Sequence, residues 1–295
     1  MSPSLRANLL LLTTAAIWGT AFVAQRVGME SVGPFTYNGV RFALGVLSLL
    51  PLIAWQARRG PAATPAGAAG ARTAFWGAVA AGLVMFGGVS LQQLGLVYTT
   101  AGKAGFITGL YVVFVPLLGL FWGQRPGLGG WTGALAAAAG LYLLSVTEDF
   151  TLAPGDGLVL VGALFWAGHV LLLGYLSPRV DAVRLAAGQF AVCAAASLAF
   201  AGACEEITWA GLWAGAWPIA YGGCMSVGVA YTLQVVAQKD AKPTPAAIIL
   251  SLESAFAALA GYLLLDELLG LRGLAGCALM LGGMLAAQLW PKSAD

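Results

Sequence analysis

Long apolar runs, separated by short polar connections, fill almost the whole chain. A helix needs about 20 apolar residues to cross the roughly 30 Å hydrocarbon core of a bilayer. Runs of about this length fall near residues 7 to 25, 34 to 56, 74 to 98, 104 to 122, 129 to 146, 156 to 176, 182 to 203, 214 to 237, 244 to 265 and 273 to 290. The pattern predicts an all-α integral membrane protein with ten transmembrane helices.

The composition excludes several classes of protein. Hydrophobic residues make up 60% of the 295 positions and charged residues only 9%, which does not fit a soluble domain. The net charge of +2 indicates no nucleic-acid partner, and no G-x-x-x-x-G-K-[ST] loop is present to bind ATP. The four cysteines stand singly, without the spacing of a metal or redox site. We expect the lipid bilayer and a small-molecule substrate as partners, with no cofactor and no metal.

Basic residues are distributed unevenly between the two sides of the predicted bundle. Cytoplasmic loops of membrane proteins carry an excess of Lys and Arg. If the N-terminus is cytoplasmic, the inner side collects Arg6, Arg58, Arg59, Arg72, Arg125, Arg179, Arg184, Lys239, Lys242 and Lys292, from a total of 14 basic residues. Several acids, Glu205 and Glu206 among them, fall on the opposite side. Both termini are therefore predicted to be cytoplasmic.

The chain resembles itself at two nearly equal offsets. A shift of about 148 residues superposes Trp18 on Trp166 and Phe42 on Phe190. A shift of about 143 residues superposes Gly127, Gly130, Gly133 and Gly140 on Gly270, Gly273, Gly276 and Gly283. We divide the chain into repeats at residues 1–150 and 151–295. Because each holds an odd number of helices, the repeats are expected to have inverted topology, which lets one chain present a midplane site to either face, and a monomer would suffice.

The run from Pro243 to Leu265 carries an acid, Glu253, near its middle. A carboxyl at the bilayer centre costs roughly 2.5 to 3.5 kcal/mol, so such a group faces a bundle interior, a partner or a wet cavity rather than lipid. Two interpretations stay open. Either Glu253 contacts a substrate or carries a coupled proton, since loss of water favours a protonated carboxyl, or it forms hydrogen bonds that lock its helix to its neighbours.

Aromatic residues at mid-depth indicate a cavity. Trp18 and Trp166 lie in the middle of their runs, whereas membrane tryptophans usually lie at the interfaces, so each needs a packing or cavity reason. Tyr111 is also near mid-depth, and Tyr231 shares a helix face with Gln234. We expect these rings to contact apolar or aromatic parts of a substrate.

Polar residues extend the candidate site. Arg41, about two turns below the outer surface, either snorkels, forms an ion pair or contacts an anion. Gln92 and Gln93 point about 100° apart, so at most one of them faces a cavity squarely. His169, the only histidine, cannot build a metal site from imidazoles, so hydrogen bonding is favoured over proton handling. The candidate substrate-binding residues are Trp18, Arg41, Gln93, Tyr111, Trp166, His169, Tyr231 and Glu253.

Three blocks resemble the drug/metabolite transporter superfamily: IWGTAFVAQRVG from Ile17 to Gly28, GLVYTTAGKAGFITGLYVVFVPLLG from Gly95 to Gly119, and AAIILSLESAFAALAGYLLLDELL from Ala246 to Leu269. The chain resembles a ten-helix member with two EamA-type repeats. The family typically shows a mid-helix Glu, here Glu253, and a second at that helix's end, here Glu267. Ser254 stands where relatives often have Pro, and Gln124 where many have Glu. The resemblance implies a basket-like transporter in the cytoplasmic (inner) membrane of a bacterium.

The leading hypothesis is a secondary exporter of small amphipathic metabolites, such as amino acids or drug-like compounds, which works by alternating access and has a proton as the candidate coupling ion. An uptake carrier or a passive facilitator of the same fold is the alternative. An intramembrane enzyme is a remote one, because a single His excludes H-E-x-x-H, and Ser226 in GGCMSVG lacks the G-x-S-x-G spacing. We therefore expect no catalytic residues.

Overall fold

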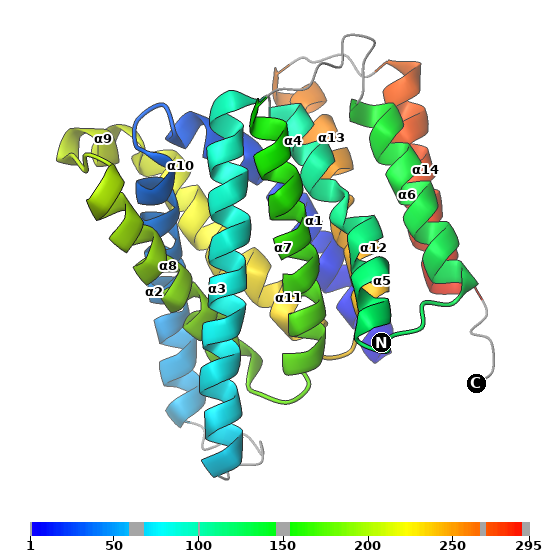
Figure 1. Cartoon of the computed structure of the whole chain (residues 1–295), viewed down its shortest axis with the longest axis horizontal. Coiled ribbons are helices and arrows are strands. Elements are labelled where there is room, and N and C mark those ends of the chain that lie inside the picture. Colours follow the sequence, from blue (N-terminus) through cyan, green and yellow to red (C-terminus); the bar gives the residue numbers. More distant parts are fainter. Residues whose placement is uncertain (1, 59–67, 100, 146–153, 266–269, 291–295) are drawn as a thin grey trace.

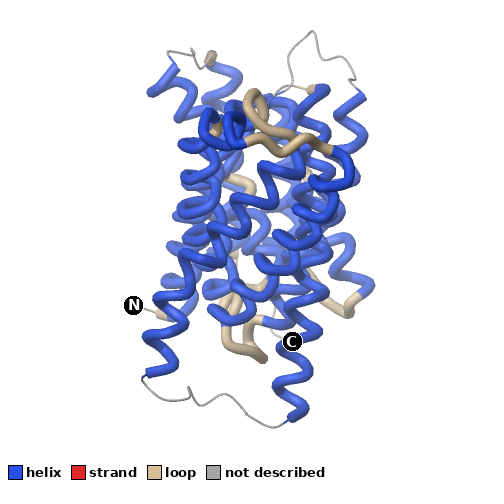
Figure 2. Tube along the Cα trace, turned by 90° about the vertical axis from the view of Figure 1, so that its left-hand side faces the viewer, coloured by secondary structure: helices blue, strands red, loops and turns tan. Residues whose placement is uncertain are grey.

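The computed structural model describes residues 2–58, 68–99, 101–145, 154–265 and 270–290. Every regular element in these ranges is a helix (Figures 1 and 2). The expected boundary between the repeats, at residues 150 and 151, lies outside the described residues, and so does Glu267. The prediction of an all-α chain is confirmed for the part that the structure describes.

Some of the predicted apolar runs form one helix each and others are interrupted. The continuous ones are α1 (Pro3–Gly28), α2 (Pro34–Arg58), α3 (Ala68–Tyr98), α6 (Leu128–Ser145), α7 (Pro154–Leu176), α8 (Ala182–Cys204) and α14 (Leu271–Leu289). The interrupted ones are α4 (Ala101–Gly109) with α5 (Tyr111–Phe121), then α9 (Trp209–Ala214), α10 (Ala216–Tyr221), the π-helix η1 (Gly222–Tyr231) and α11 (Thr232–Ala237), and finally α12 (Pro243–Leu250) with α13 (Glu253–Leu265).

Not every run is long enough to be a candidate span by itself. Among the described residues, 7 helical segments have the length and hydropathy to cross a membrane. Three further helices, Leu128–Leu143, Pro243–Leu259 and Leu271–Ala287, are apolar but shorter. The chain is therefore a helical protein with several candidate spans, and ten crossings remain a prediction.

Local sequence explains where several helices begin. The hydroxyl of Ser2 accepts a hydrogen bond from the backbone N–H of Leu5 at 3.2 Å, and Pro3 occupies the first turn of α1. The carboxylate of Asp181 caps α8 in the same way, accepting from the N–H of Arg184 at 2.9 Å. Such side chains satisfy N–H groups that have no partner within the helix.

The helix ends lie at two opposite ends of the bundle. α1 begins and α14 ends at the lower end in Figure 1, where α2, α5, α7 and α11 also end and α3, α6, α8 and α12 begin. These helix ends and the connections next to them carry Arg6, Arg58, Arg72, Arg125, Arg179, Arg184, Lys239 and Lys242. The basic residues assigned to the inner side thus lie at one end, and the assignment of that end to the cytoplasm stays a prediction.

Exposed aromatic residues form a belt at each end of the bundle. The helix ends at the upper end carry Tyr98, Tyr142, Trp209, Trp213 and Trp217, and those at the lower end carry Trp55, Phe75, Trp76, Phe121 and Trp122. Tryptophan and tyrosine are enriched at both membrane–water interfaces. The two belts therefore fit the boundaries of a bilayer, and Trp18 and Trp166 lie between them.

Contacts between helices follow the same pattern in the first and second parts of the chain. α2 packs against α8, and α6 packs against α14. α3 packs against α7, and the segment from α10 to α11 packs in the same way against α1. α7 also contacts α4 and α5, while α1 contacts α12 and α13. Each of these contacts of an early helix thus has a counterpart among the late ones.

Glycines allow the closest of these contacts. A Cβ at Gly283 would lie 2.7 Å from the carbonyl oxygen of Gly133, and a Cβ at Gly133 would lie 2.7 Å from that of Gly283. A Cβ at Gly140 would lie 2.6 Å from the oxygen of Gly276. Small residues let membrane helices approach until their backbones touch. These glycines therefore set how α6 and α14 are aligned against each other.

Two helices are interrupted at matching positions. The break between α4 and α5 falls at Leu110, and the break between α12 and α13 falls at Ser251 and Leu252. The offset of about 143 residues found in the sequence carries Leu110 onto Glu253. Backbone bonds at both breaks join residues three apart, as from Leu252 N to the oxygen of Ile249 at 3.2 Å, which is 3₁₀ geometry. Pro116 does not mark either break, because it lies inside α5.

Candidate functional site

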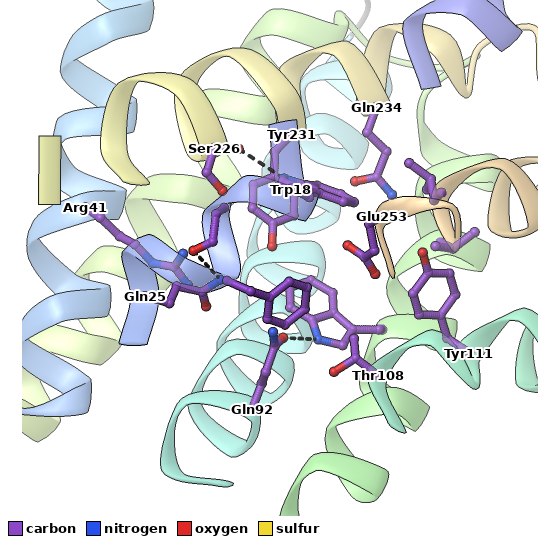
Figure 3. A pocket seen from close by; sticks show the side chains of 15 residues that line it. Trp18, Gln25, Arg41, Gln92, Thr108, Tyr111, Ser226, Tyr231, Gln234 and Glu253 are labelled. Carbon is purple, nitrogen blue, oxygen red and sulfur yellow. Dashed lines mark hydrogen bonds between the residues drawn. The ribbon is translucent and has the colours of Figure 1, made fainter. Parts of the chain in front are cut away.

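A pocket lies between helices from both parts of the chain (Figure 3). Its empty volume, with the open solvent at its mouth included, is about 500 Å³. It is lined by Trp18, Ala21, Phe22, Gln25, Arg41, Gln92, Thr108, Tyr111, Trp166, Val170, Ser226, Tyr231, Gln234, Leu250 and Glu253. The pocket thus combines an aromatic wall, one base and one acid.

Tyr231 is the centre of the aromatic wall. Its ring centroid lies 4.5 Å from that of Trp18 and 5.9 Å from that of Trp166, with the Trp166 ring inclined by only 18°. Phe42 and Phe190 pack behind it, at 6.0 and 6.2 Å. The two tryptophans that match in the sequence repeat therefore both contact Tyr231. The pair with Trp166 is stacked and the pair with Trp18 is tilted, and aromatic rings prefer such arrangements.

The π-helix η1 brings two lining residues to one face. Ser226 and Tyr231 are five residues apart, and in an α-helix they would point roughly 140° apart. In a π-helix, hydrogen bonds join residues five apart, so these two lie one above the other. Both line the pocket, which fits the frequent occurrence of π-helical turns at functional sites.

Side chains of α1 hold the π-helix in place. The indole N–H of Trp18 donates to the carbonyl oxygen of Ser226 at 3.3 Å, and the hydroxyl of Thr14 donates to that of Ala230 at 3.1 Å. The hydroxyl of Tyr221 donates in return to the oxygen of Ile17 at 3.2 Å. The stripe of Thr14 and Trp18 on α1 therefore faces the interior and orients η1.

Arg41 is buried, with 2% of its surface exposed, rather than extended to the interface. Its Nε donates to Asn38 Oδ1 at 3.1 Å. The guanidinium carbon lies 5.1 Å from the ring centroid of Phe42 and 5.2 Å from that of Tyr37, within cation–π range. The bond to Asn38 uses only Nε, so the two terminal amino groups remain for a ligand in the pocket that Arg41 lines.

Of the two adjacent glutamines, the structure brings Gln92 to the pocket and not Gln93. Gln92 Oε1 accepts a hydrogen bond from the indole N–H of Trp166 at 2.9 Å, so its amide nitrogen remains a donor. Gln93 is fully buried, and its amide donates to the carbonyl oxygen of Gln25 at 3.5 Å. Gln93 was expected in the substrate site, and its place is between α3 and α1 instead.

His169 lies behind the aromatic wall and does not line the pocket. It is fully buried, and its Nε2 shares a hydrogen bond of 2.9 Å with Gln189 Oε1. Its ring is edge-on to Trp166 at 5.9 Å and to Tyr231 at 6.5 Å. The structure therefore favours hydrogen bonding and ring support over substrate contact for the histidine expected in the site.

Glu253 is the first residue of α13 and has 4% of its surface exposed. Gly19 lies so close that a Cβ there would be 2.7 Å from the carbonyl oxygen of Glu253, which ties α1 to the break. The next residue, Ser254, donates from its hydroxyl to the oxygen of Gly105 at 3.3 Å. In Figure 3 the Glu253 carboxyl points into the pocket between Gln234 and Tyr111.

Several lining residues were not singled out from the sequence as substrate contacts. Thr108 lies one turn before Tyr111, a spacing that could have indicated a shared face. Ser226 was considered only as a nucleophile, and nothing in its surroundings signals a π-helix. Phe22 and Leu250 belong to apolar runs in which every position looks alike.

These features define a multi-pass membrane protein with a polar and aromatic pocket inside an apolar helical bundle. The model of the EamA-like transporter family matches residues 5–146 and again residues 153–287. The chain therefore belongs to the EamA-like transporter family, within the drug/metabolite transporter superfamily, as the resemblance implied.

Individual proteins agree with this assignment. The chain is 32% identical over 270 residues to a protein of Archaeoglobus fulgidus described as an uncharacterized transporter, a match that covers 90% of this chain and 80% of that protein. A second protein of that organism with the same description is 29% identical over 196 residues, which is 63% of this chain and 64% of that protein. A solved crystal structure is similar at a TM-score of 0.76 and 21% identity over 96% of each chain, which shows the fold alone.

Proposed function

We propose that this transporter is a secondary exporter that carries small amphipathic metabolites, such as amino acids or drug-like compounds, through the pocket by alternating access. The observation that carries the proposal is the pocket itself, to which both regions matched by the family model contribute. The first region supplies Trp18, Arg41 and Tyr111, and the second supplies Trp166, Tyr231 and Glu253. Relative motion of the two regions would open such a pocket to one side at a time.

Inverted repeats are part of this proposal. The family model matches the chain twice, and the helix contacts recur when the early and late helices are exchanged. The interrupted helices also match, because α5 begins with Tyr111 and α13 begins with Glu253. Discontinuous helices of this kind form the substrate sites of several transporter folds. We propose the boundary of the repeats near residues 150 and 151.

The pocket residues have distinct roles in the proposal. Trp18, Trp166 and Tyr231 contact the apolar or aromatic part of the substrate, where ring burial contributes most of the binding free energy. Arg41 contacts an anionic group through its free amino groups. Glu253 contacts the opposite end of the substrate or carries the coupled proton.

Counterflow tests the transport reaction. The purified protein is reconstituted in liposomes that are loaded with an unlabelled amino acid, and uptake of the radiolabelled compound is followed. We expect saturable uptake that the internal substrate stimulates. Uptake without trans-stimulation would indicate the passive facilitator instead, and no uptake of any amino acid or drug-like cation in a panel would contradict the proposed substrate class.

Direction and coupling need a separate experiment. In liposomes that hold the protein in one known orientation, the side that corresponds to the outside of the cell is made acidic. An exporter that exchanges substrate for protons then moves substrate toward that side, against the substrate gradient. An uptake carrier moves it the opposite way under the same gradient. If Glu253 carries the coupled proton, Glu253→Gln should still exchange substrate at saturating concentration but lose the drive by the pH gradient. If this variant responds to the gradient as the parent protein does, Glu253 is not the proton carrier.

A further inference from the structure

Buried oxygen atoms without hydrogen-bond partners gather at one end of the pocket. Thr108 Oγ1 and Gln234 Oε1 are buried and make no hydrogen bond. Tyr111 Oη is also buried, and its nearest polar partner is Glu253. All three residues line the pocket with Glu253. Buried polar atoms are nearly always paired, so each exception needs an explanation. Here the exceptions come from α4, α5 and α11, which are different elements brought to one place.

The geometry around Glu253 is that of an acceptor site. In Figure 3 the amide of Gln234 lies on one side of the Glu253 carboxyl and the hydroxyl of Tyr111 on another, with Thr108 below. The Tyr111 hydroxyl is close enough to the Glu253 carboxyl to act as its donor in a long hydrogen bond, so the lone pairs of the tyrosine oxygen remain for a ligand. A carboxylate, an amide oxygen and two hydroxyl oxygens are acceptors with free lone pairs.

The opposite end of the pocket has the complementary chemistry. Arg41 and the amide nitrogen of Gln92 offer donors there, because Gln92 Oε1 is occupied by the Trp166 indole. A ligand that completed both ends would be positive at the Glu253 end. The aromatic rings beside that end, Trp18 and Tyr231 at 4.5 Å from each other, are also favourable neighbours for a cation.

We propose that Thr108, Tyr111, Gln234 and Glu253 form a subsite for a monovalent cation. The cation is the ammonium group of an organic ligand, whose donors would satisfy these acceptors, or else a sodium ion from solution. The aromatic wall of the same pocket, formed by Trp18, Trp166 and Tyr231, would contact the organic body of such a ligand. The subsite rests on the proposed function only in treating this pocket as the place where the substrate binds.

Equilibrium binding separates the two sources of the cation. Phenethylammonium chloride and its uncharged analogue 2-phenylethanol are titrated against the purified protein in detergent, and thermal unfolding is followed. Sodium chloride is exchanged for potassium chloride at constant ionic strength in a parallel series. A ligand that binds only the folded state raises the midpoint of unfolding. We expect phenethylammonium to raise it and 2-phenylethanol not to; a sodium-specific rise would assign the subsite to sodium.

Variants assign the effect to the subsite. Glu253→Gln is expected to weaken binding of the cation at least tenfold, and Tyr111→Phe, which removes one oxygen and keeps the charge, about threefold. Tyr111→Phe and Gln234→Leu also keep the proposal testable if Glu253→Gln does not fold. Glu206→Gln, at an exposed acid outside the pocket, is the matched control and should bind as the parent protein does.

Two results would overturn the subsite. One is binding of phenethylammonium and 2-phenylethanol with equal affinity, or of neither cation. The other is undiminished binding by Glu253→Gln. If counterflow persists in either case, the transporter proposal stands and only the cation subsite is removed. If the cation binds but no counterflow is seen, the subsite stands and the transporter proposal is removed.

Discussion

Glu205, at the end of α8, accepts hydrogen bonds from both the backbone N–H and the hydroxyl of Thr36, in the first turn of α2, each at 2.7 Å. Its other carboxylate oxygen accepts from the N–H of Phe35 at 2.8 Å. Gly33 makes room, since a Cβ there would lie 2.3 Å from the Glu205 carboxyl carbon. An acid distant in sequence thus caps α2 and joins it to α8 at the upper end.

Removing this cap should destabilise the bundle. We predict that Glu205→Ala lowers the free energy of unfolding by about 1 to 2 kcal/mol, because two backbone N–H groups and a hydroxyl lose their acceptor. Chemical unfolding in mixed micelles measures the change. Glu206→Ala is the control, since Glu206 is exposed and next in the chain. Equal stability of the two variants would contradict the capping role.

The contact between α6 and α14 gives a second prediction from neighbouring glycines. Gly283→Ala would place a Cβ 2.7 Å from the backbone oxygen of Gly133, whereas a Cβ at Gly282 meets nothing within 4 Å. Forcing helices apart at a backbone contact typically costs about 1 to 3 kcal/mol. We therefore expect Gly283→Ala to lower the midpoint of thermal unfolding and Gly282→Ala to leave it unchanged or raise it slightly. A reversed order would show that the register of this pair is different.

Trp18 contributes both a ring and a hydrogen bond, which two substitutions separate. We predict that Trp18→Ala weakens substrate binding roughly tenfold, about 1.4 kcal/mol, through the lost aromatic contact. Trp18→Phe keeps a ring but removes the N–H that donates to Ser226, and should cost about 1 kcal/mol of stability. Substrate titration in the counterflow assay and thermal unfolding measure the two effects. Trp213→Ala, at a ring that is 84% exposed, is the control; if Trp18→Ala binds substrate as that control does, Trp18 is not a substrate contact.

Much of the site was accessible from the sequence because polar and aromatic residues are rare in the middle of apolar runs. That argument identified Trp18, Trp166 and Glu253, and all of them line the pocket. It selected Gln93, whereas Gln92 lines the pocket, since both are equally unusual in a membrane helix and only the rotation of α3 decides. It also could not separate His169 from the site, because Trp166 on the same face lies between the histidine and the pocket.

The fold was predictable as a set of helices but not in its irregular parts. Hydropathy predicts helical runs and says nothing of hydrogen-bond register, so the π-helix from Gly222 to Tyr231 leaves no periodic signal. The breaks before Tyr111 and Glu253 likewise fall within continuous apolar runs. No proline marks the first break, since Pro116 lies within α5. These irregular segments pack against other helices: η1 and the α12–α13 pair contact α1, and α4 and α5 contact α7.

The packing of the π-helix against α2 gives a final prediction through a pair of residues. A Cβ at Gly228 would lie 2.2 Å from Ser48 Oγ and 3.2 Å from Ser48 Cβ, so Gly228→Ala collides mainly with the hydroxyl. We predict that Gly228→Ala destabilises the protein by about 1 to 3 kcal/mol. Ser48→Ala alone loses the hydrogen bond of 2.7 Å to the oxygen of Gly45, at a cost of about 1 kcal/mol. In the double variant the Oγ is absent and the new methyl group meets only a Cβ, so the two costs should not add. Unfolding of all four proteins gives the coupling between the sites. Strict additivity would mean that Gly228 and Ser48 do not touch.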